Sequence, residues 1–369
     1  MSSETTLKQT PMFEYYKKQG VKLIDFGGWA MPIQFTGIIE EHKAVRSHAG
    51  LFDASHMGEF LIEGKDAESY LNHLLTNDVT QAALNQAQYH AMCYPDGGTI
   101  DDLILSKLAK NRYLITTNAG NTEKDFKWMQ EHLTGDVKLE DYSDSIGLLA
   151  LQGPSAESIL QKLTDVDLGG IGSFRFVQQA TVAGIENVLI SRTGYTGEEG
   201  FELYVEAVQT ENLWRQLVEV GEAEGLKPCG LGSRDTLRLE AALSLYGHEL
   251  SAEITPLQAG IGFAVKTKKD SDFIGKTVLA AQRESGVKKK IRGFELTGKG
   301  IAREGCKVYT ESGKEIGVVT SGTRSPSLGK SIGLALLDAA ESNFGTSIKV
   351  EVRNKLVDAL VMKTPFYRR

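Results

Sequence analysis

The chain has 369 residues, of which 41% are hydrophobic and 24% charged, a composition typical of globular proteins. This length exceeds what one hydrophobic core usually organises, so two or three domains are expected. The formal net charge of −7 argues against non-specific binding to nucleic acid or to an anionic membrane, and leaves small-molecule sites open.

Helical and strand patterns alternate irregularly over the first 265 residues. Apolar positions at helical spacing predict a helix over residues 38–48. Further helical patterns cover 67–75, 121–133, 155–163 and 210–225, and strand alternation covers 58–64 and 186–195. This mixture favours an α+β fold over a regular βαβ array.

The character of the chain changes after Val265. Residues 266–293 form a charged segment that predicts a connector with a short helix. Beyond it, residues 291–369 contain short strand patterns separated by glycine turns. They predict a separate all-β unit, a small barrel or jelly roll.

The sequence also bears on compartment and redox state. Residues 1–16 lack the apolar segment of a signal peptide, and no apolar run reaches the roughly 20 residues that a membrane helix needs, so a cytoplasmic protein is expected. Cys93, Cys229 and Cys306 lie far apart, which favours reduced thiols. His90 and Cys93 form a close pair, but without a second pair no metal site is expected.

Two adjacent aspartates, Asp101 and Asp102, interrupt the apolar strand pattern TIDDLIL at 99–105. Neighbouring side chains of a strand point to opposite faces, and here both faces carry Ile or Leu. At least one carboxylate is therefore expected in poorly solvated surroundings, where an unpaired charge is costly. Two explanations stay open: a solvated aspartate beside one that caps the preceding turn, or a general acid–base or electrostatic residue.

Several catalytic motifs are absent from the sequence. No GxGxxG follows a predicted strand, and there is no Walker A motif, no GxSxG elbow and no HExxH. Hydride transfer, phosphoryl transfer, serine hydrolysis and zinc proteolysis therefore lose support.

Seven stretches in matching order resemble the aminomethyltransferase (T-protein) family of the glycine cleavage system. They are DFGGWAMPIQF (25–35), LFDASHMGEF (51–60), LLTNDV (74–79), GGTIDDLIL (97–105), SRTGYTGEEGFEL (191–203), GLGSRDTLRLEAALSLYG (230–247) and VTSGTRSPSLGKSIGLA (319–335). The resemblance extends from about residue 10 to residue 369. Cys229 and Ser233 stand where the family often has alanine, and neither side chain belongs to the expected chemistry.

The resemblance implies an α+β, three-domain folate-binding fold around a central channel. Two interleaved α+β domains would form the folate-binding region at 1–275, and a C-terminal β-barrel or jelly roll would cover 285–369. The implied activity is a tetrahydrofolate-dependent transfer. The aminomethyl group comes from the lipoyl arm of the carrier H-protein, ammonia is released, and methylene-tetrahydrofolate is formed. The decarboxylase and dihydrolipoamide dehydrogenase would be partners through the carrier, with no nucleic-acid partner.

The resemblance also implies site residues. It assigns the catalytic role to the second aspartate, Asp102, which we therefore expect to be the poorly solvated carboxylate. The implied folate-binding residues are Met57, Tyr89, Asn118, Tyr195, Glu202 and Arg234. A carboxylate at Glu202 suits the two adjacent N–H donors of a pterin edge. No metal ligand is implied.

Each position also has an ordinary structural explanation. Glu202 alternates with Phe201 and Leu203, as a residue on a solvated strand face does. The two tyrosines and the methionine suit a hydrophobic core, and Arg234 suits a surface ion pair. Ser233 is a plausible N-cap for the helix that follows, and we expect Glu198 and Glu199 to be solvated loop acids.

Other functions of the same superfamily fit less well. The non-catalytic folate-binding proteins of iron–sulfur repair carry a KGCYxGQE loop, whereas RTGYTGEEG at 192–200 has no cysteine. The folate domains of dimethylglycine and sarcosine oxidases accompany a flavin-binding Rossmann domain, for which this chain has no motif. A scaffolding role would leave the folate-type cluster unexplained.

Overall fold

The computed structural model describes residues 7–369; residues 1–6, the start of the stretch that lacks a signal-peptide pattern, lie outside the described residues. The chain forms two compact units. Unit 1 comprises residues 1–67, 82–88 and 104–235, and unit 2 comprises residues 68–81, 89–103 and 236–369. Strands β5 (Ala87–Cys93) and β6 (Thr99–Ala109) and helix α7 (Leu231–Glu240) run across the unit boundaries.

The larger sheet of unit 1 has six strands in the order β10-β11-β12-β9-β3-β13. Neighbouring strands are antiparallel except β3 and β13, which are parallel. The strands are β3 (Ala49–Asp53), β9 (Ile146–Gln152), β10 (Phe176–Val182), β11 (Ile185–Ser191), β12 (Gly200–Glu206) and β13 (Leu226–Cys229). The strand predicted over 186–195 is confirmed over 186–191 as part of β11, and residues 192–195 belong to the loop before β12.

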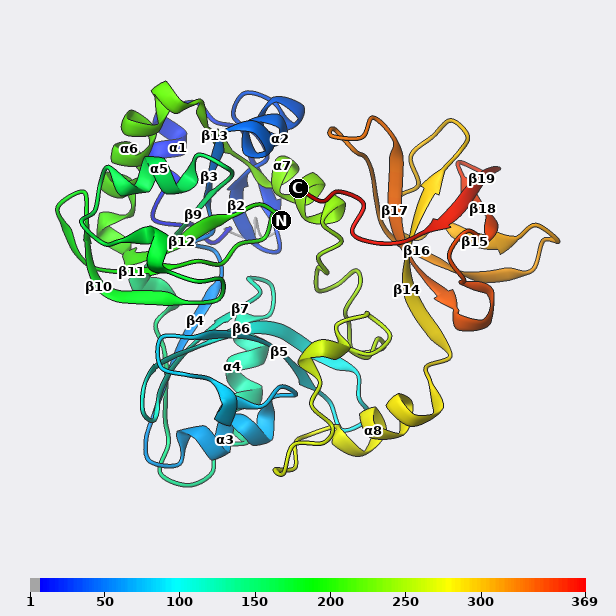
Figure 1. Cartoon of the computed structure of the whole chain (residues 1–369), viewed down its shortest axis with the longest axis horizontal. Helices are drawn as coiled ribbons and strands as arrows, with labels where there is room; N and C mark the ends of the chain where they lie inside the picture. The colour runs from blue at the N-terminus through cyan, green and yellow to red at the C-terminus, as the bar shows by residue number, and fades with distance from the viewer. Residues whose placement is uncertain (1–6) are drawn as a thin grey trace, which may run out of the picture. The chain divides into compact units, whose positions relative to one another are not determined.

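Three helices cover one face of this sheet: α1 (Phe13–Lys18), α5 (Ala156–Gln161) and α6 (Thr210–Gly221) (Figure 1). Tyr16 and Trp214 from these helices are buried in a core with Phe201, Leu203 and Val205 of β12. Burial of such side chains, at roughly 1.5–3 kcal/mol each, is the main stabilising contribution to this layer. Strand alternation therefore directs the intervening residues of β12 to the opposite face, as the sequence predicts.

The second sheet has the order β5-β6-β7-β4-β8. Its strands in unit 1 include β4 (Gly58–Glu63), β7 (Arg112–Thr117) and β8 (Lys138–Asp141), and helix α4 (Thr122–Glu131) packs on it through an edge-to-face contact of Phe60 with Phe126. Leu114 of β7, Leu148 of β9 and Tyr204 of β12 share a small apolar cluster. The two sheets of unit 1 thus pack together on the side of β12 that the helices leave uncovered.

A buried glutamate, Glu41 on α2 (Ile38–Ser47), organises the start of α7. Its Oε1 accepts the backbone N–H groups of residues 35–37 at 2.6, 3.0 and 3.2 Å. Its Oε2 accepts the N–H of Gly230 at 2.9 Å and the hydroxyl of Ser233 at 3.1 Å. The predicted N-cap role of Ser233 is wrong, because α7 already begins at Leu231 and the Glu41 carboxylate takes the preceding N–H.

Unit 2 contains a closed six-stranded barrel in the order β14-β17-β16-β15-β18-β19. Its strands are β14 (Lys289–Leu296), β15 (Lys307–Thr310), β16 (Glu315–Arg324), β17 (Ser331–Asp338), β18 (Ser347–Val352) and β19 (Lys355–Met362). Alternate residues such as Phe294, Val308 and Val350 fill its interior. The all-β unit predicted for the C-terminal part is confirmed, and of the two architectures named it is the barrel.

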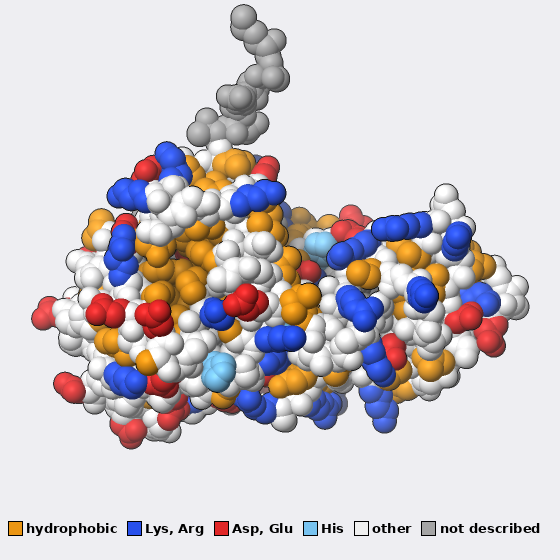
Figure 2. Space-filling model, turned by 90° about the horizontal axis from the view of Figure 1, so that it is seen from above, with side chains coloured by type: hydrophobic (Ala, Val, Ile, Leu, Met, Phe, Trp, Pro, Cys, Tyr) orange, Lys and Arg blue, Asp and Glu red, His pale blue; other side chains and the backbone are white. Residues whose placement is uncertain are grey.

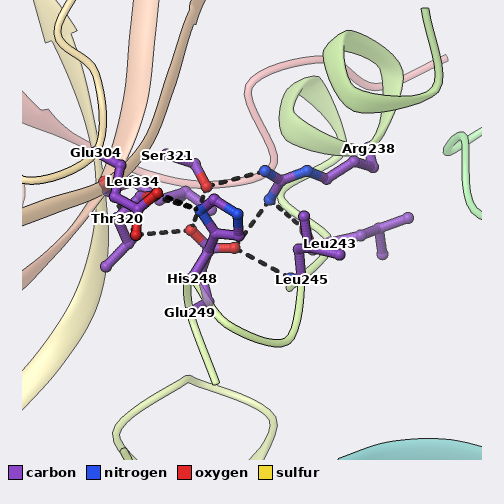
Figure 3. A network of polar contacts seen from close by, with 9 residues as sticks. All are labelled: Arg238, Leu243, Leu245, His248, Glu249, Glu304, Thr320, Ser321 and Leu334. Carbon is purple, nitrogen blue, oxygen red and sulfur yellow. Dashed lines mark hydrogen bonds and ion pairs between the residues drawn. The ribbon is translucent and has the colours of Figure 1, made fainter. Parts of the chain in front are cut away.

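A buried ion pair joins the segment after α7 to the barrel (Figure 3). Arg238 Nη1 lies 2.8 Å from Glu249 Oε2, and both side chains are buried. The other carboxylate oxygen accepts the hydroxyls of Thr320 and Ser321 on β16 at 2.6 and 2.7 Å. These contacts compensate two charges that would be costly if unpaired.

The five helices predicted in the first 265 residues are confirmed, with shorter bounds, as α2, α3 (Ala67–Leu74), α4, α5 and α6. The short helix predicted in the connector is α8 (Lys276–Ser285). The remaining elements are the strands β1 (Leu23–Phe26) and β2 (Trp29–Pro32) and 3₁₀ turns at Val79–Gln81, Ser143–Ser145, Leu168–Gly170, Ala207–Gln209, Glu222–Glu224, Gly262–Ala264 and Ala339–Glu341. Within residues 7–369, no helix is both long and apolar enough to cross a membrane.

Candidate functional site

The loop before β12 is held by residues from two other elements, β9 and α2. Gln152 Nε2 donates to the carbonyl of Thr193 at 3.1 Å, and the Thr196 hydroxyl donates to Gln152 Oε1 at 2.9 Å. Arg46 of α2 donates to the carbonyl of Thr196 at 2.8 Å. A Cβ at Gly194 would lie 1.9 Å from Gln152 Oε1, so this close approach needs glycine.

Glu198 contributes to the same support. Its side chain is fully buried and pairs with Arg46 Nη1 at 3.1 Å. The expectation that it is a solvated loop acid is therefore wrong, because a cation on a distant helix compensates its burial. Glu199, by contrast, is exposed, as expected. The loop is thereby fixed on both sides of Tyr195.

Three of the predicted folate-binding residues come together in unit 1. The Arg234 guanidinium lies 4.7 Å from the centre of the Tyr195 ring, a cation–π distance. The Thr193 hydroxyl, 2.9 Å from that of Ser191, donates to the carboxylate of Glu202, a partly buried residue. Burial raises the pKa of Glu202, while the Thr193 hydrogen bond and the Arg234 charge oppose the shift. Burial lowers the pKa of Arg234, and Tyr195 and Glu202 counter it.

Met57 and Asn118 also belong to unit 1. Met57 is partly buried and packs against the cluster that contains Leu148 and Tyr204, on the Glu202 side of β12. Asn118 follows β7, and its carbonyl accepts the N–H of Asn121 at 2.9 Å in the turn that leads into α4. The soft thioether of Met57 suits the wall of a ligand site.

Two polar residues near this cluster were missed by the sequence analysis. His56 is 2% exposed, and its ring meets Phe26 edge-on at 5.7 Å. Burial, followed by the charge of Arg234, lowers the pKa of His56 to about 3, so the imidazole is neutral at neutral pH. Glu59 of β4 is 0% exposed. The signal was present, because Glu59 interrupts an apolar strand as the two aspartates do.

The catalytic candidate lies in unit 2. Asp102 is partly exposed, and its Oδ2 accepts the Tyr89 hydroxyl at 2.8 Å. The Tyr89 ring stacks on Phe263 with centroids 5.7 Å apart. Asp101 is 0% exposed, so the expectation that Asp102 is the poorly solvated carboxylate is wrong. Asp101 shares its strand face with the buried Leu103 and Leu105, whereas the face of Asp102 is only partly covered at Ile104.

The structure thus places the predicted site residues in two groups. Met57, Asn118, Tyr195, Glu202 and Arg234 belong to unit 1, and Tyr89 and Asp102 belong to unit 2. Within residues 7–369, no group of three or more His, Cys, Asp and Glu side chains is arranged to hold a metal ion. The chemistry that these groups offer is acceptance of N–H donors and stabilisation of positive charge.

Comparison with known proteins decides the family. The GCVT N-terminal domain model matches residues 12–269, and the glycine cleavage T-protein C-terminal barrel domain model matches residues 289–368. The chain belongs to the glycine cleavage T-protein family. A curated aminomethyltransferase of Bacillus subtilis (strain 168) is 54% identical over 98% of this chain and 100% of its own length. One of Listeria monocytogenes serotype 4b (strain F2365) is 53% identical over 99% of each chain.

A solved T-protein supports the same conclusion for the fold. The crystal structure of the glycine cleavage system aminomethyltransferase T from Bartonella henselae matches with a TM-score of 0.91 and 31% identity, covering 98% of each chain. The predicted family and the mixed helix and strand fold with a C-terminal barrel are confirmed. The chain is an enzyme, a transferase of the aminomethyltransferase type, as predicted.

Proposed function

We propose that this T-protein family member transfers the aminomethyl group from the lipoyl arm of the carrier H-protein to tetrahydrofolate. Ammonia and methylene-tetrahydrofolate are the products. The observation that carries the proposal is the arrangement of Glu202 beside Arg234 and Tyr195, within a chain that matches aminomethyltransferases over its full length. The proposed domains are the folate-binding region at 1–275 and the barrel at 285–369, and the proposed location is the cytoplasm.

The unit 1 group is suited to the pterin end of the folate. A carboxylate at Glu202 accepts two parallel N–H bonds, and such charge-assisted bonds are the stronger class. The Thr193 hydroxyl orients this carboxylate, and the Arg234 charge favours its ionised form. Tyr195 offers an aromatic surface, and Arg234 supplies a cation for an acidic cofactor. Met57 and Asn118 are proposed as further contacts.

The unit 2 pair is suited to the reacting centre. As the methylene group passes from sulfur to nitrogen, positive charge develops, and a carboxylate nearby stabilises it. Asp102 is accessible enough to reach a ligand, while the Tyr89 hydroxyl holds its orientation. The fully buried Asp101 lacks that access. We therefore keep Asp102 as the catalytic residue and Tyr89 as a folate contact that also orients it.

The charge of the C-terminal part suits a partner with an acidic surface. Residues 288–369 contain 16 Lys and Arg but 8 Asp and Glu, although the whole chain is acidic. Figure 2 shows Lys and Arg side chains spread over the visible face of the barrel. Complementary charge accelerates association and selects partners. The decarboxylase and dihydrolipoamide dehydrogenase would act through the carrier.

The alternative of a non-catalytic folate-binding protein of the iron–sulfur repair type lacks its characteristic cysteine, because residues 192–200 contain none. Within residues 7–369 the three cysteines are free, and Cys93 and Cys229 are buried. Burial raises the pKa of both buried thiols, which keeps them protonated and unreactive.

The test is ammonia release from purified protein mixed with tetrahydrofolate and aminomethyl-loaded H-protein. Asp102→Asn should lower turnover by roughly 10²–10⁴-fold, with a much smaller change in folate affinity, because the charge acts mainly on the transition state. The matched control is Asp101→Asn, which should retain turnover and lower the melting temperature instead. Full activity of Asp102→Asn, or loss of turnover in the control alone, would contradict the assignment.

A further inference from the structure

Glu59 of β4 is a buried carboxyl group without a counter-charge. Neither Oε1 nor Oε2 has a hydrogen-bond partner among the described residues, and the residue is 0% exposed. Its backbone is nevertheless well held: the N–H donates to Ser143 Oγ at 3.0 Å, and the carbonyl accepts the N–H of Tyr142 at 2.8 Å. An ionised carboxylate in this position would be very costly, whereas a neutral acid costs far less.

The strand register places Glu59 on the Glu202 side of unit 1. Glu59 is paired with Thr116 of β7, and the Thr116 hydroxyl lies 3.2 Å from that of Tyr204. Tyr204 is two residues from Glu202 on β12, so the two side chains share a face. Glu59 therefore lies on the side of β12 that carries Glu202, the carboxylate proposed to hold the pterin, and interacts electrostatically with it.

The titratable groups that act on Glu59 are all acids. They are Asp141 from β8 and Glu202 and Tyr204 from β12. Burial raises the pKa of Glu59 well above its usual range, and Asp141 and Glu202 raise it further. Glu202 is also buried enough to have a raised pKa, but Thr193 and Arg234 oppose that shift. With rising pH, Glu202 therefore ionises before Glu59.

We propose that Glu59 keeps its proton, so that Glu59 and Glu202 together carry one negative charge, located on Glu202. This rests on the proposed folate site. Two interacting carboxyl groups of this kind lose their protons in separate steps. A charge on Glu59 would favour protonation of Glu202, which would then no longer accept two N–H bonds from a ligand.

The protonation state is measured without a ligand. The infrared difference spectrum between the native protein and Glu59→Gln at pH 7 should contain the carbonyl band of a protonated carboxylic acid, which the variant lacks. Glu63→Gln is the control, because Glu63 lies on the same strand, is partly exposed and pairs with Arg112 at 2.6 Å. It should lose an ionised carboxylate band. An ionised carboxylate band lost in Glu59→Gln would overturn the proposal, whether or not folate binds.

The effect on the folate site is measured by calorimetry with tetrahydrofolate at a series of pH values, from neutral down to the acidic range in which affinity is lost. Because Glu59→Gln replaces a neutral group by a neutral group of similar shape, affinity at neutral pH should change by less than about threefold, with the same acid midpoint. If Glu59 were charged, its removal would lower that midpoint by about one pH unit or more, and the proposal would fall. Glu59→Met, which also keeps the shape, should behave alike. If no form binds tetrahydrofolate, the proposed function fails while the infrared result still stands.

Discussion

Replacing Glu249 by alanine should destabilise unit 2 by about 3–5 kcal/mol, the cost typical of leaving one member of a buried ion pair uncompensated. Arg238 would keep its hydrogen bonds to the carbonyl of Leu243 at 3.3 Å and to Ser321 Oγ at 2.9 Å, but would lose its counter-charge. The N–H of Leu245 and the hydroxyls of Thr320 and Ser321 would lose an acceptor as well (Figure 3).

A double variant distinguishes the cost of one uncompensated charge from the net contribution of the ion pair. Arg238→Met combined with Glu249→Leu removes both charges together, and buried pairs replaced by apolar side chains of similar size are often no less stable. The Thr320 hydroxyl retains the carbonyl of Leu334 at 3.2 Å as an acceptor. Part of the loss should therefore be recovered, with a remaining cost of about 1 kcal/mol each for the Ser321 hydroxyl and the Leu245 N–H, which both lose their acceptor.

The assay is urea denaturation combined with hydrogen exchange at barrel amides, since a chain of two units need not unfold in one step. Asp358→Asn is the control, because its pair with Lys349 at 2.8 Å is exposed and should contribute less than about 1 kcal/mol. If Glu249→Ala loses no more stability than this control, the buried pair does not hold the barrel strand as argued.

Three further predictions concern ligand binding and pH. Glu202→Gln should weaken tetrahydrofolate binding by roughly ten- to a hundredfold in calorimetry, since a charge-assisted hydrogen bond contributes about 1.5–3 kcal/mol. The exposed Glu206→Gln should not weaken binding, and equal affinities of the native protein and Glu202→Gln would show that Glu202 does not hold the ligand. Limited proteolysis should cut within residues 266–290 more readily in the free protein than with folate bound, and unchanged cleavage would show that folate does not protect this segment. The neutral imidazole of His56 contributes stability above its unfolded pKa of 6.5 that is lost as pH falls to about 3. His56→Gln should reduce the change in the free energy of unfolding between about pH 6.5 and pH 3, measured by urea denaturation at several pH values. An unchanged pH dependence would show that other groups cause the loss of stability in acid.

Local periodicity was sufficient to predict most helices and strands, and to predict which side chains of β12 point toward the core. The helix α2 and the strands of the barrel follow from spacing that repeats within a few residues. On β12, the burial of Phe201 and Leu203 and the opposite facing of Glu202 follow from alternation alone. The family resemblance rested on short motifs in matching order, which are read from the sequence without knowledge of the packing.

Which of two adjacent acids is buried was not readable from the sequence. Alternation places Asp101 and Asp102 on opposite faces, but both faces carry apolar residues. The choice depends on which face the rest of the fold covers, and the structure covers the face of Asp101. The resemblance selected Asp102 for the catalytic role, and only the added expectation that Asp102 is the poorly solvated carboxylate is wrong, since Asp101 is the buried one.

The remaining differences arise from partners that are distant along the chain. Glu198 is buried because Arg46, 152 residues earlier, supplies a cation, and Ser233 is no N-cap because Glu41, 192 residues earlier, supplies a carboxylate. Glu59 is enclosed by strands whose pairing the local pattern does not encode. Sequence periodicity determined which elements form and which way their side chains face. The burial and charge of each polar group were decided only by tertiary structure, because desolvation and Coulomb interactions depend on distance in space.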